Sequence, residues 1–396
     1  MTPRIVIIGG GGTGAALAHD LALRGLAVTL LERGEVTSGT TGRHHGLLHS
    51  GGRYALTDQR SATECIQENR ILRRIAPGSF EENGGLFVAV TDEDADHLGD
   101  FVGACAACGI PTKVLSREAV LRLEPALTPD VRVAVTVPDA TMDAMRLPLR
   151  FFATAVRNGA VLRPFTEVVG FIRQGRWISA VAARDHAAGR DVVVPALLVV
   201  NAAGPWSGQI AALAGARVPI RPSPGVLIAV RGRWCDRVLN RLHPPGDGDI
   251  VLPQRGLSIV GTTSWTTDNP DDTQIPADHV EAILREGARL VPAVGQAPLR
   301  AAWSAVRPLV GSSGADSGRT LSRTFRCFDH ATGDGVDNLI TITGGKATTV
   351  RAMAAAAADL VCAKLGVIAP CRTAETVLLP HTAYYTKSAV RSEVVA

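Results

Sequence analysis

The first 32 residues alternate apolar runs with a glycine-rich turn and a helical stretch. Residues 4–8 predict a buried strand, residues 9–14 a glycine turn, residues 15–24 a helix closed by Gly25, and residues 27–32 a second strand. Strand, turn, helix and strand in this order predict a βαβ unit.

Similar patterns predict further elements along the chain. Residues 61–76 and 92–109 have helical spacing, and residues 84–90 have the composition of a strand. The later predicted elements are strands at 195–200, 226–230, 250–252, 257–261 and 339–343, and helices at 207–214, 277–290 and 347–365. Because Pro/Gly turns separate the strands of residues 217–334, we expect an antiparallel sheet there.

The predicted fold is α/β: a Rossmann-like FAD/NAD(P)-binding domain with a second, α+β substrate domain built on a mostly antiparallel sheet. We expect the nucleotide-binding domain to be discontinuous, because strand, glycine turn and helix patterns return late in the chain. Its predicted segments are 1–75, 150–215 and 335–380; the substrate domain takes 76–149 and 216–334, and 381–396 form a C-terminal tail.

Composition narrows the function classes. The chain has 396 residues, 46% hydrophobic and 20% charged, which is typical of a globular protein with room for two cores. A net charge of only +4 does not favour a nucleic-acid binder, although a local basic pocket for an anionic substrate stays open. The longest apolar runs, residues 5–8 and 192–200, are too short to cross a bilayer, so we expect no integral membrane segment.

The first predicted strand begins within four residues of the N-terminus, which leaves no room for a signal peptide. We expect a cytoplasmic protein, with peripheral attachment at the inner membrane face left open. The seven scattered cysteines predict reduced thiols rather than a disulfide framework. Cys105 and Cys108 form a CxxC at the end of a predicted helix, but no second pair stands at zinc spacing, so we expect no metal.

The turn at residues 9–14 satisfies GxGxxG, directly after a strand and at the start of a helix. Gly9 permits the tight turn, Gly11 lets a pyrophosphate approach the backbone, and Gly14 allows close packing of helix and strand. Glu32 ends the second strand, where its carboxylate can bind ribose hydroxyls and would repel a 2′-phosphate. The alternative is a purely structural glycine turn, and the motif alone does not separate NAD from FAD.

Two further segments favour FAD. Residues 38–54 are dense in Gly, hydroxyl and basic groups and hold three histidines, which suits a loop along a cofactor that faces an anion; the alternative is a solvated loop. Residues 340–349 predict a second strand, glycine turn and helix, with Lys346 beside the helix N-terminus. Such a terminus would stabilise negative charge on a reduced flavin, whereas a plain turn is the alternative.

Four segments together resemble the FAD-dependent glycerol-3-phosphate dehydrogenases, most of all the large FAD subunit of the anaerobic enzyme, within the D-amino-acid-oxidase-like superfamily. They are His-Ser-Gly-Gly-Arg-Tyr at 49–54, Asn-Ala-Ala-Gly-Pro-Trp at 201–206, Ser-Ala-Val-Arg-Pro-Leu at 304–309 and Ile-Thr-Ile-Thr-Gly-Gly-Lys at 340–346. The resemblance runs from about residue 4 to residue 380.

The resemblance implies a site for each part of the reaction. The implied cofactor-binding residues are Gly9, Gly11, Gly12, Thr13, Gly14, Glu32, Arg33, Thr40, Thr41, Arg43, His45, Gly46, Leu47, Val168, Ala202, Ala203, Gly204, Trp206, Gly344, Gly345, Lys346, Ala347 and Thr348. The implied substrate-binding residues are Arg53, Tyr54, Arg307 and Lys346, since Arg offers a planar fork to a phosphate and Lys a compact charge. We expect His49 or His45 as the general base, with Arg307 and Lys346 as the other catalytic residues.

The expected activity is oxidation of the secondary alcohol of glycerol-3-phosphate, or of a close phosphate or phosphonate analogue, to a ketone, with hydride transfer to flavin N5. The sequence departs from the family pattern at residues 224–227 (Pro-Gly-Val-Leu, where Lys-Gly-Ser is frequent), at Val350 (often Tyr) and at His44 (usually Asn). An amine, amino-acid or 2-hydroxy-acid oxidase, or a flavin-carrying electron-transfer subunit, therefore stays an alternative. The electron acceptor is left open between oxygen, a quinone and an iron-sulfur partner subunit. The cysteine-rich C-terminal extension of relatives is not present in the 396 residues, so we expect electron delivery to differ.

Overall fold

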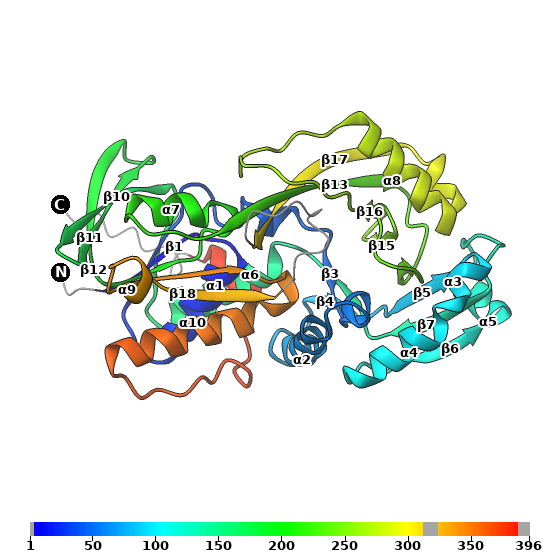
Figure 1. Ribbon diagram of the computed structural model, residues 1–396, viewed down its shortest axis with the longest axis horizontal. Helices are drawn as coiled ribbons and strands as arrows, with labels where there is room; N and C mark the ends of the chain where they lie inside the picture. The colour runs from blue at the N-terminus through cyan, green and yellow to red at the C-terminus, as the bar shows by residue number, and fades with distance from the viewer. Residues whose placement is uncertain (1–3, 312–323, 387–396) are drawn as a thin grey trace.

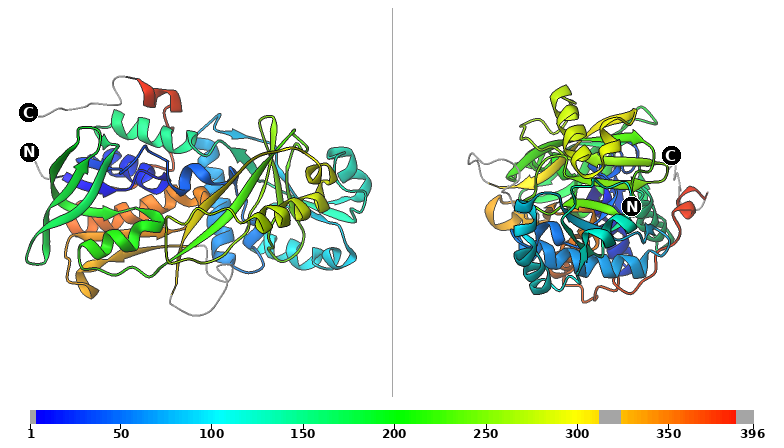
Figure 2. Two further views of the ribbon diagram at one scale, coloured as in Figure 1. Left: turned by 90° about the horizontal axis from the view of Figure 1, so that it is seen from above. Right: turned by 90° about the vertical axis from the view of Figure 1, so that its right-hand side faces the viewer.

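The computed structural model describes residues 4–311 and 324–386. Within these residues the chain forms two sheets of eight strands each and a small sheet of three strands. The two large sheets lie in two lobes side by side along the molecule, as Figure 1 shows and Figure 2 repeats from above.

The first sheet has a parallel centre. Strand β1 (Arg4–Ile8) pairs in parallel with β12 (Arg190–Asn201) on one side and with β2 (Val28–Leu31) on the other. Two further strands extend the parallel part: β9 (Val161–Arg163) pairs with β2, and β19 (Leu339–Gly344) pairs with β12. The remaining strands pair antiparallel: β10 (Thr166–Gln174) with β11 (Trp177–Asp185), β11 with β12, and β18 (Phe325–Asp329) with β19. The predicted Rossmann-like domain is confirmed.

Other elements cover both faces of this sheet. Successive side chains of a strand point to opposite faces, so the apolar residues of β1 pack into two cores, one on each face. Ile5 and Ile7 of β1 pack in the core that holds α1 (Gly12–Leu23), α6 (Arg146–Arg157) and α10 (Val350–Leu365). Val6 and Ile8 pack on the other face, with α7 (Ser207–Leu213) and strands β10 and β11. Figure 1 shows α7 and α10 on opposite sides of β1.

The second sheet has the order β17-β13-β16-β15-β14-β5-β7-β6 and is antiparallel except for the pair of β5 and β14. Its strands are β5 (Gly85–Ala89), β6 (Lys113–Ser116), β7 (Val133–Val137), β13 (Ile220–Arg231), β14 (Val238–Arg241), β15 (Ile250–Gln254), β16 (Leu257–Gly261) and β17 (Leu299–Val310). Ile228 packs toward α8 (Ala277–Leu290), whereas Leu227 packs on the opposite face with Leu47. This confirms the mostly antiparallel second sheet, and Figure 1 shows that β13 and β17 extend between the lobes.

Strand β13 is longer than the predicted strand at 226–230, because Pro222 and Pro224 lie inside it rather than in a turn. Both prolines pair with β17 on one side. On the other side the loop after β16 donates the Trp265 and Thr267 amides to the Pro224 and Pro222 carbonyl oxygens, at 3.3 and 3.0 Å. A proline lacks only the donor, so a side of the strand that needs acceptors tolerates it.

The predicted helices are present with shifted ends. The predicted helix at 92–109 is two helices, α3 (Asp92–Asp96) and α4 (Leu98–Ala107), joined at His97. The helix predicted at 15–24 already begins at Gly12, since the glycines of the turn adopt its first turn. The remaining elements are α2 (Gln59–Ile75), α5 (Arg117–Leu123), α9 (His330–Gly333), the small-sheet strands β3 (Leu47–Leu48), β4 (Phe80–Glu81) and β8 (Ala140–Met142), and 3-10 turns η1 (Thr40–Arg43), η2 (Gly52–Tyr54), η3 (Gly204–Trp206), η4 (Pro292–Gly295), η5 (Ala347–Thr349) and η6 (His381–Tyr385).

Strand pairing differs from the predicted domain ranges at two places. β18 pairs with β19 in the first sheet, although residues 216–334 were expected in the substrate domain. Helix α6 begins at Arg146, before the expected boundary at residue 150, and its apolar face packs on α1. The other boundaries stay a prediction.

Two observations concern the cysteines and the membrane. None of the seven cysteines, all of which lie in the described ranges, takes part in a disulfide. Cys105 and Cys108 are buried around the end of α4, and burial raises the pKa of the Cys105 thiol to about 12. Among residues 4–311 and 324–386, no helix combines the length and hydrophobicity that crossing a bilayer requires.

Candidate FAD and substrate site

The turn between β1 and α1 forms one end of a large cavity. Gly9 has a φ of +110°, and a Cβ there would lie 2.6 Å from the carbonyl oxygen of Ala202. A Cβ on Gly14 would lie 1.9 Å from the carbonyl oxygen of Gly9. Strand, turn and helix therefore approach as closely as the glycine motif requires, and the N-terminus of α1 is presented to the cavity.

Glu32 holds the other side of this turn. Its carboxylate accepts hydrogen bonds from the amides of Gly10, at 2.6 Å, and Gly34, at 2.9 Å. The side chain lines the cavity at the end of β2, so its remaining lone pairs are available to ribose hydroxyls.

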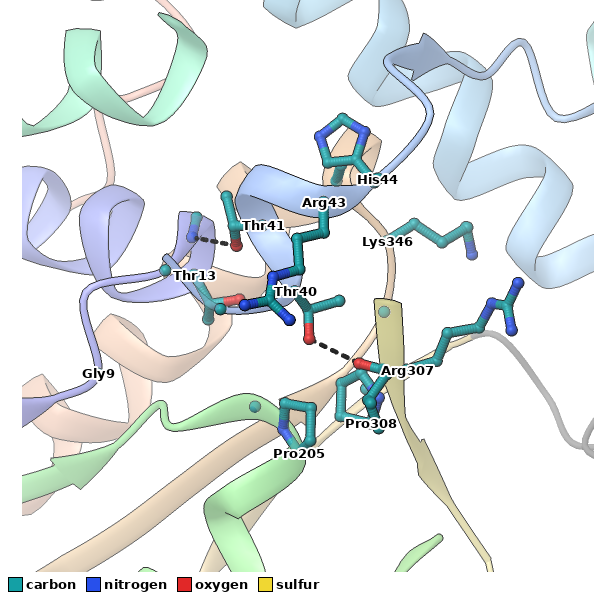
Figure 3. Close-up of a pocket in the computed structure, with 18 of the residues that line it drawn as sticks. Gly9, Thr13, Thr40, Thr41, Arg43, His44, Pro205, Arg307, Pro308 and Lys346 are labelled. Atoms are coloured by element: carbon teal, nitrogen blue, oxygen red, sulfur yellow. Dashed lines mark hydrogen bonds between the residues drawn. The ribbon is translucent and has the colours of Figure 1, made fainter. Parts of the chain in front are cut away.

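The turn η1 connects the two lobes across the cavity. Thr41 accepts a hydrogen bond from the Gly12 amide at 2.9 Å, on the nucleotide-binding side. Thr40 donates to the carbonyl oxygen of Val306 in β17, at 2.6 Å, on the other side. Figure 3 shows Thr40, Thr41 and Arg43 between the glycine turn at one end and Arg307 and Lys346 at the other.

The cavity has a volume of about 1450 Å³ and is continuous from Gly9 to Lys346. All the site residues predicted from the sequence line it except Gly14, Gly46 and Thr348. Gly14 lies inside the helix–strand contact. Gly46 has a φ of +85°, and Thr348 accepts the His49 amide at 3.0 Å, so both support the wall from behind.

At the Lys346 end, three aromatic rings stack edge to face or tilted. The His49 ring lies 5.7 Å from the His45 ring and 5.6 Å from the Tyr54 ring, centroid to centroid. The Lys346 ammonium lies 4.9 Å from the centre of the Tyr54 ring, within the range of a cation–π contact. His49, a candidate base, and Lys346, a candidate cation, therefore both contact the ring of Tyr54.

The histidines differ in the hydrogen bonds of their rings. His44 and His45 each accept a backbone amide through Nδ1, from Gly46 at 2.9 Å and from Leu47 at 3.1 Å. Among the described residues the His49 ring has no hydrogen-bond partner. Burial, reinforced by Lys346 and Arg53, lowers the pKa of His49 to about 3, and burial lowers that of His44 to about 4 and that of His45 well below its ordinary value. All three rings are therefore neutral at pH 7.

The guanidinium of Arg307, a residue of β17, lies against β13 and the loop after β16. It donates to the carbonyl oxygens of Pro224 and Thr263, at 3.4 and 3.3 Å, and to the hydroxyl of Thr262. A Cβ on Gly225 would lie 2.6 Å from both terminal nitrogens of Arg307. Pro224, at which the sequence departs from the family pattern, thus accepts a hydrogen bond from a predicted substrate-binding residue, and Gly225 leaves room for its guanidinium.

Arg53 is held by a carboxylate that the sequence did not indicate. Its Nη2 donates to Asp249 Oδ1 at 2.7 Å and to the Gly246 carbonyl oxygen at 3.2 Å. Asp249 precedes β15 and its side chain is only 2% exposed. Arg53 lines the cavity as predicted, but it does so as half of a buried ion pair.

Comparison with known proteins agrees with this geometry. The family model described as FAD dependent oxidoreductase (DAO) matches residues 4–360. The A subunit of the anaerobic glycerol-3-phosphate dehydrogenase of Escherichia coli (strain K12) is 44% identical over 376 residues, which is 94% of this chain and 69% of that protein. The chain belongs to the DAO family of FAD-dependent oxidoreductases. In the same family group, the corresponding A1 subunit of Haloferax volcanii is 42% identical over 386 residues, 94% of this chain and 66% of that protein.

Solved structures place this DAO-family oxidoreductase in the same fold. The glycerol-3-phosphate dehydrogenase of Bacillus halodurans, complexed with FAD, superposes with a TM-score of 0.73 at 25% identity, over 95% of this chain and 68% of that chain. A glycine oxidase of Geobacillus kaustophilus has the same TM-score at 23% identity, over 95% and 98% of the two chains, which shows the fold alone. The cofactor of this flavoprotein is FAD, and the glycine cradle, where a Cβ would collide, fits it.

Sequence reasoning missed two carboxylates of the flavoprotein's site. Asp249 gave no signal, because Gly-Asp-Gly-Asp at 246–249 is a common turn composition. Asp271 was missed at the nucleotide end, where it accepts a hydrogen bond from the Trp206 indole nitrogen at 2.9 Å, while the predicted Arg33 lies over the Trp206 ring at 4.3 Å. Asp271 comes from the loop after β16, so this loop of the second lobe reaches the rim of the nucleotide-binding end.

Proposed function

We propose that this flavoprotein oxidises the secondary alcohol of glycerol-3-phosphate, or of a close phosphate or phosphonate analogue, to a ketone. The observation that carries the proposal is that one cavity joins the glycine turn to Arg53, Arg307 and Lys346. Three cationic side chains at the end remote from the glycine turn suit an anionic substrate held beside the cofactor. The names of the relatives, glycerol-3-phosphate dehydrogenases, indicate the same substrate.

The FAD-binding residues of this proposal follow from their place on the wall. The α1 N-terminus and the glycine turn would hold the pyrophosphate, and Glu32 would hold the ribose, since all of them line one end of the cavity. The Gly344–Gly345 turn and Ala347 of η5, which line the cavity next to Lys346, would hold the flavin. When bound, FAD supplies a hydride acceptor at flavin N5.

The substrate's oxygen atoms meet cations of this chain. Arg307 and Arg53 bind the phosphate oxygens and orient the carbinol carbon, and Lys346 polarises the hydroxyl oxygen. The substrate C–H leaves with its electron pair as hydride, and the O–H proton passes to a base of the protein, so the alcohol loses two electrons and becomes a ketone.

His49 is the base in this proposal and His45 is not. His45 Nδ1 accepts the Leu47 amide, so the proton of its neutral ring is on Nε2, and the ring presents a donor to the cavity. Taking a proton at Nε2 would require the ring to change tautomer and give up that hydrogen bond. His49 is neutral and has no such constraint among the described residues, so one of its nitrogens can accept the proton.

Anaerobic bleaching of the flavin absorbance tests the proposal on the purified FAD-loaded protein. Glycerol-3-phosphate should bleach the flavin, whereas 2-hydroxy acids and amino acids should leave it oxidised. Bleaching by an amino acid or a 2-hydroxy acid alone would replace this function by the oxidase alternative.

Two matched variants test the base. His49→Gln should slow flavin reduction at saturating substrate by about 10² or more, the range of general-base catalysis. His45→Gln, which can keep a side-chain acceptor near the Leu47 amide, should slow it less than about tenfold, the worth of one hydrogen bond. Near-normal reduction in His49→Gln contradicts the assignment.

We also propose that electrons leave to a partner protein, because the relatives are named as the A subunits of their enzymes. Reduced protein should then be reoxidised slowly by oxygen and fast by an added partner or by a soluble one-electron acceptor. Fast reoxidation by oxygen alone would make the protein an oxidase.

A further inference from the structure

The buried pair of Arg53 and Asp249 lies where two distant segments of the second lobe meet the cavity. Arg53 belongs to η2, and Asp249 ends the loop between β14 and β15. Their side chains are 12% and 2% exposed, and the Nη2 to Oδ1 distance is 2.7 Å. The second carboxylate oxygen accepts the Gly246 amide at 2.7 Å, so Asp249 is fixed before it meets the arginine.

The hydrogen bonds of Arg53 use only one of its nitrogens. Both hydrogen bonds of its side chain, to Asp249 and to the Gly246 carbonyl, start from Nη2. Within the described ranges Nη1 and Nε donate to no protein group, while the residue lines the cavity. A guanidinium carries five N–H groups in a rigid fork, so fixing one corner sets the direction of the other donors.

We propose that Asp249 is a positioning residue for substrate binding: it holds Arg53 so that the Nε and Nη1 donors engage the substrate phosphate. The inference rests on the proposed function, in which Arg53 binds that phosphate. Asp249 acts through Arg53 and does not touch the substrate.

The sign of the effect separates positioning from charge. A buried carboxylate near a bound anion repels it, so removal of Asp249 would strengthen phosphate binding if charge alone mattered. Loss of positioning has the opposite effect, because the freed guanidinium must be ordered again when substrate binds. A positioning role therefore predicts a weaker substrate interaction after removal of a negative charge.

The chain offers a matched control pair. Arg241 and Asp94 form an ion pair at 2.9 Å with side chains 15% and 2% exposed, in the same lobe, and neither lines the cavity. Asp94→Ala therefore removes an equally buried carboxylate from an arginine that has no part in the site.

The experiment measures steady-state oxidation of glycerol-3-phosphate by FAD-loaded Asp249→Ala, Asp94→Ala, Arg53→Ala and the Arg53→Ala/Asp249→Ala double variant, with thermal melting as a check of folding. Asp249→Ala should raise KM about tenfold, the worth of a hydrogen bond to a charged group, and change kcat less than about twofold. Asp94→Ala should leave KM unchanged at a comparable loss of stability. In the Arg53→Ala background Asp249→Ala should raise KM no further, since the residue acts through Arg53.

The competitive inhibition constant of inorganic phosphate should rise with KM in Asp249→Ala. If that variant does not fold, Asp249→Asn serves, because its single amide oxygen can accept from Arg53 or from the Gly246 amide but not from both, and KM should again rise. An unchanged or lower KM in either variant, or an equal rise in the Arg53→Ala background, overturns the proposal. Wild-type protein that does not oxidise glycerol-3-phosphate would instead refute the proposed function.

Discussion

His19 offers a sharp test of how burial controls protonation in the nucleotide-binding lobe. The residue lies on α1, is 0% exposed, and packs on Phe151 with ring centroids 5.7 Å apart. Neither ring nitrogen has a hydrogen-bond partner among the described residues. Replacement by Leu removes two buried polar atoms from an apolar core without a large change of volume.

The magnitude follows from the pKa. Burial lowers the pKa of His19 to about 4, and the neighbouring Asp20 carboxylate offsets only part of this shift. In the unfolded chain the pKa of a histidine is about 6.5. Between these values the unfolded chain binds a proton that the native protein does not, so this residue lowers stability as the pH falls below about 6.5, and the loss is complete near pH 4. Between pH 7 and pH 5 the cost is about 2 kcal/mol.

Urea unfolding at saturating FAD measures this cost. His19→Leu should be more stable than the wild type by about 1 kcal/mol at pH 7, and the gap should widen by about 2 kcal/mol at pH 5. The other buried histidines titrate in both proteins and cancel in the difference. A gap that stays constant from pH 7 to pH 5 would refute the reasoning.

Three further predictions concern the cavity. Arg43 lines the cavity, its guanidinium bonds to no described residue, and Figure 3 shows it directed toward Thr13 and Thr40. Arg43→Gln should weaken FAD binding to the apoprotein about tenfold, because one charge-assisted contact to a phosphate of FAD is lost. An unchanged dissociation constant in a fluorescence titration would count against that phosphate contact. Gly14→Ala should yield protein that is purified largely without FAD, because the new Cβ would lie 1.9 Å from the Gly9 carbonyl oxygen. Gly99→Ala is the control and should keep its FAD, because a Cβ at Gly99 meets no atom within 4 Å. Equal flavin absorbance per protein in the two variants would contradict the prediction. Burial, Lys346 and Arg53 lower the pKa of His49 to about 3, so the base stays neutral in mild acid before substrate binds. Anaerobic flavin reduction at low substrate, where the rate reports the free enzyme, should therefore lose no rate to His49 protonation between pH 7 and about pH 5; an acid limb near pH 6.5 that His49→Gln abolishes would disprove the shift.

The fold was predictable where the signal is local. The βαβ unit follows from a strand, a glycine turn and a helix within 32 residues, and the structure has them in that order. The first part of β12 was missed, because residues 190–194 begin with Arg190 and Asp191 and pair only with β11, a contact that the local sequence does not reveal. The extra length of β13 was missed because proline argues against a central strand, and only the loop after β16, which supplies donors to the proline carbonyls, makes it acceptable.

The residues of the site also fall into two groups: those that local motifs predict, and those that only the fold brings together. Glycines, Glu32 and the three cations stand in motifs that can be read locally, but Asp249 meets Arg53 across 196 residues of sequence. The motifs alone give the substrate end the cations Arg53, Arg307 and Lys346, whereas the structure adds the buried carboxylate of Asp249, which fixes one corner of the Arg53 guanidinium. A phosphate monoester presents three acceptor oxygens and a charge of about −1.5 to −2 at pH 7, whereas an amino acid or a 2-hydroxy acid presents a single carboxylate. Guanidinium donors that are held in fixed directions are therefore a physical reason to expect selection for the phosphate over amino acids and 2-hydroxy acids.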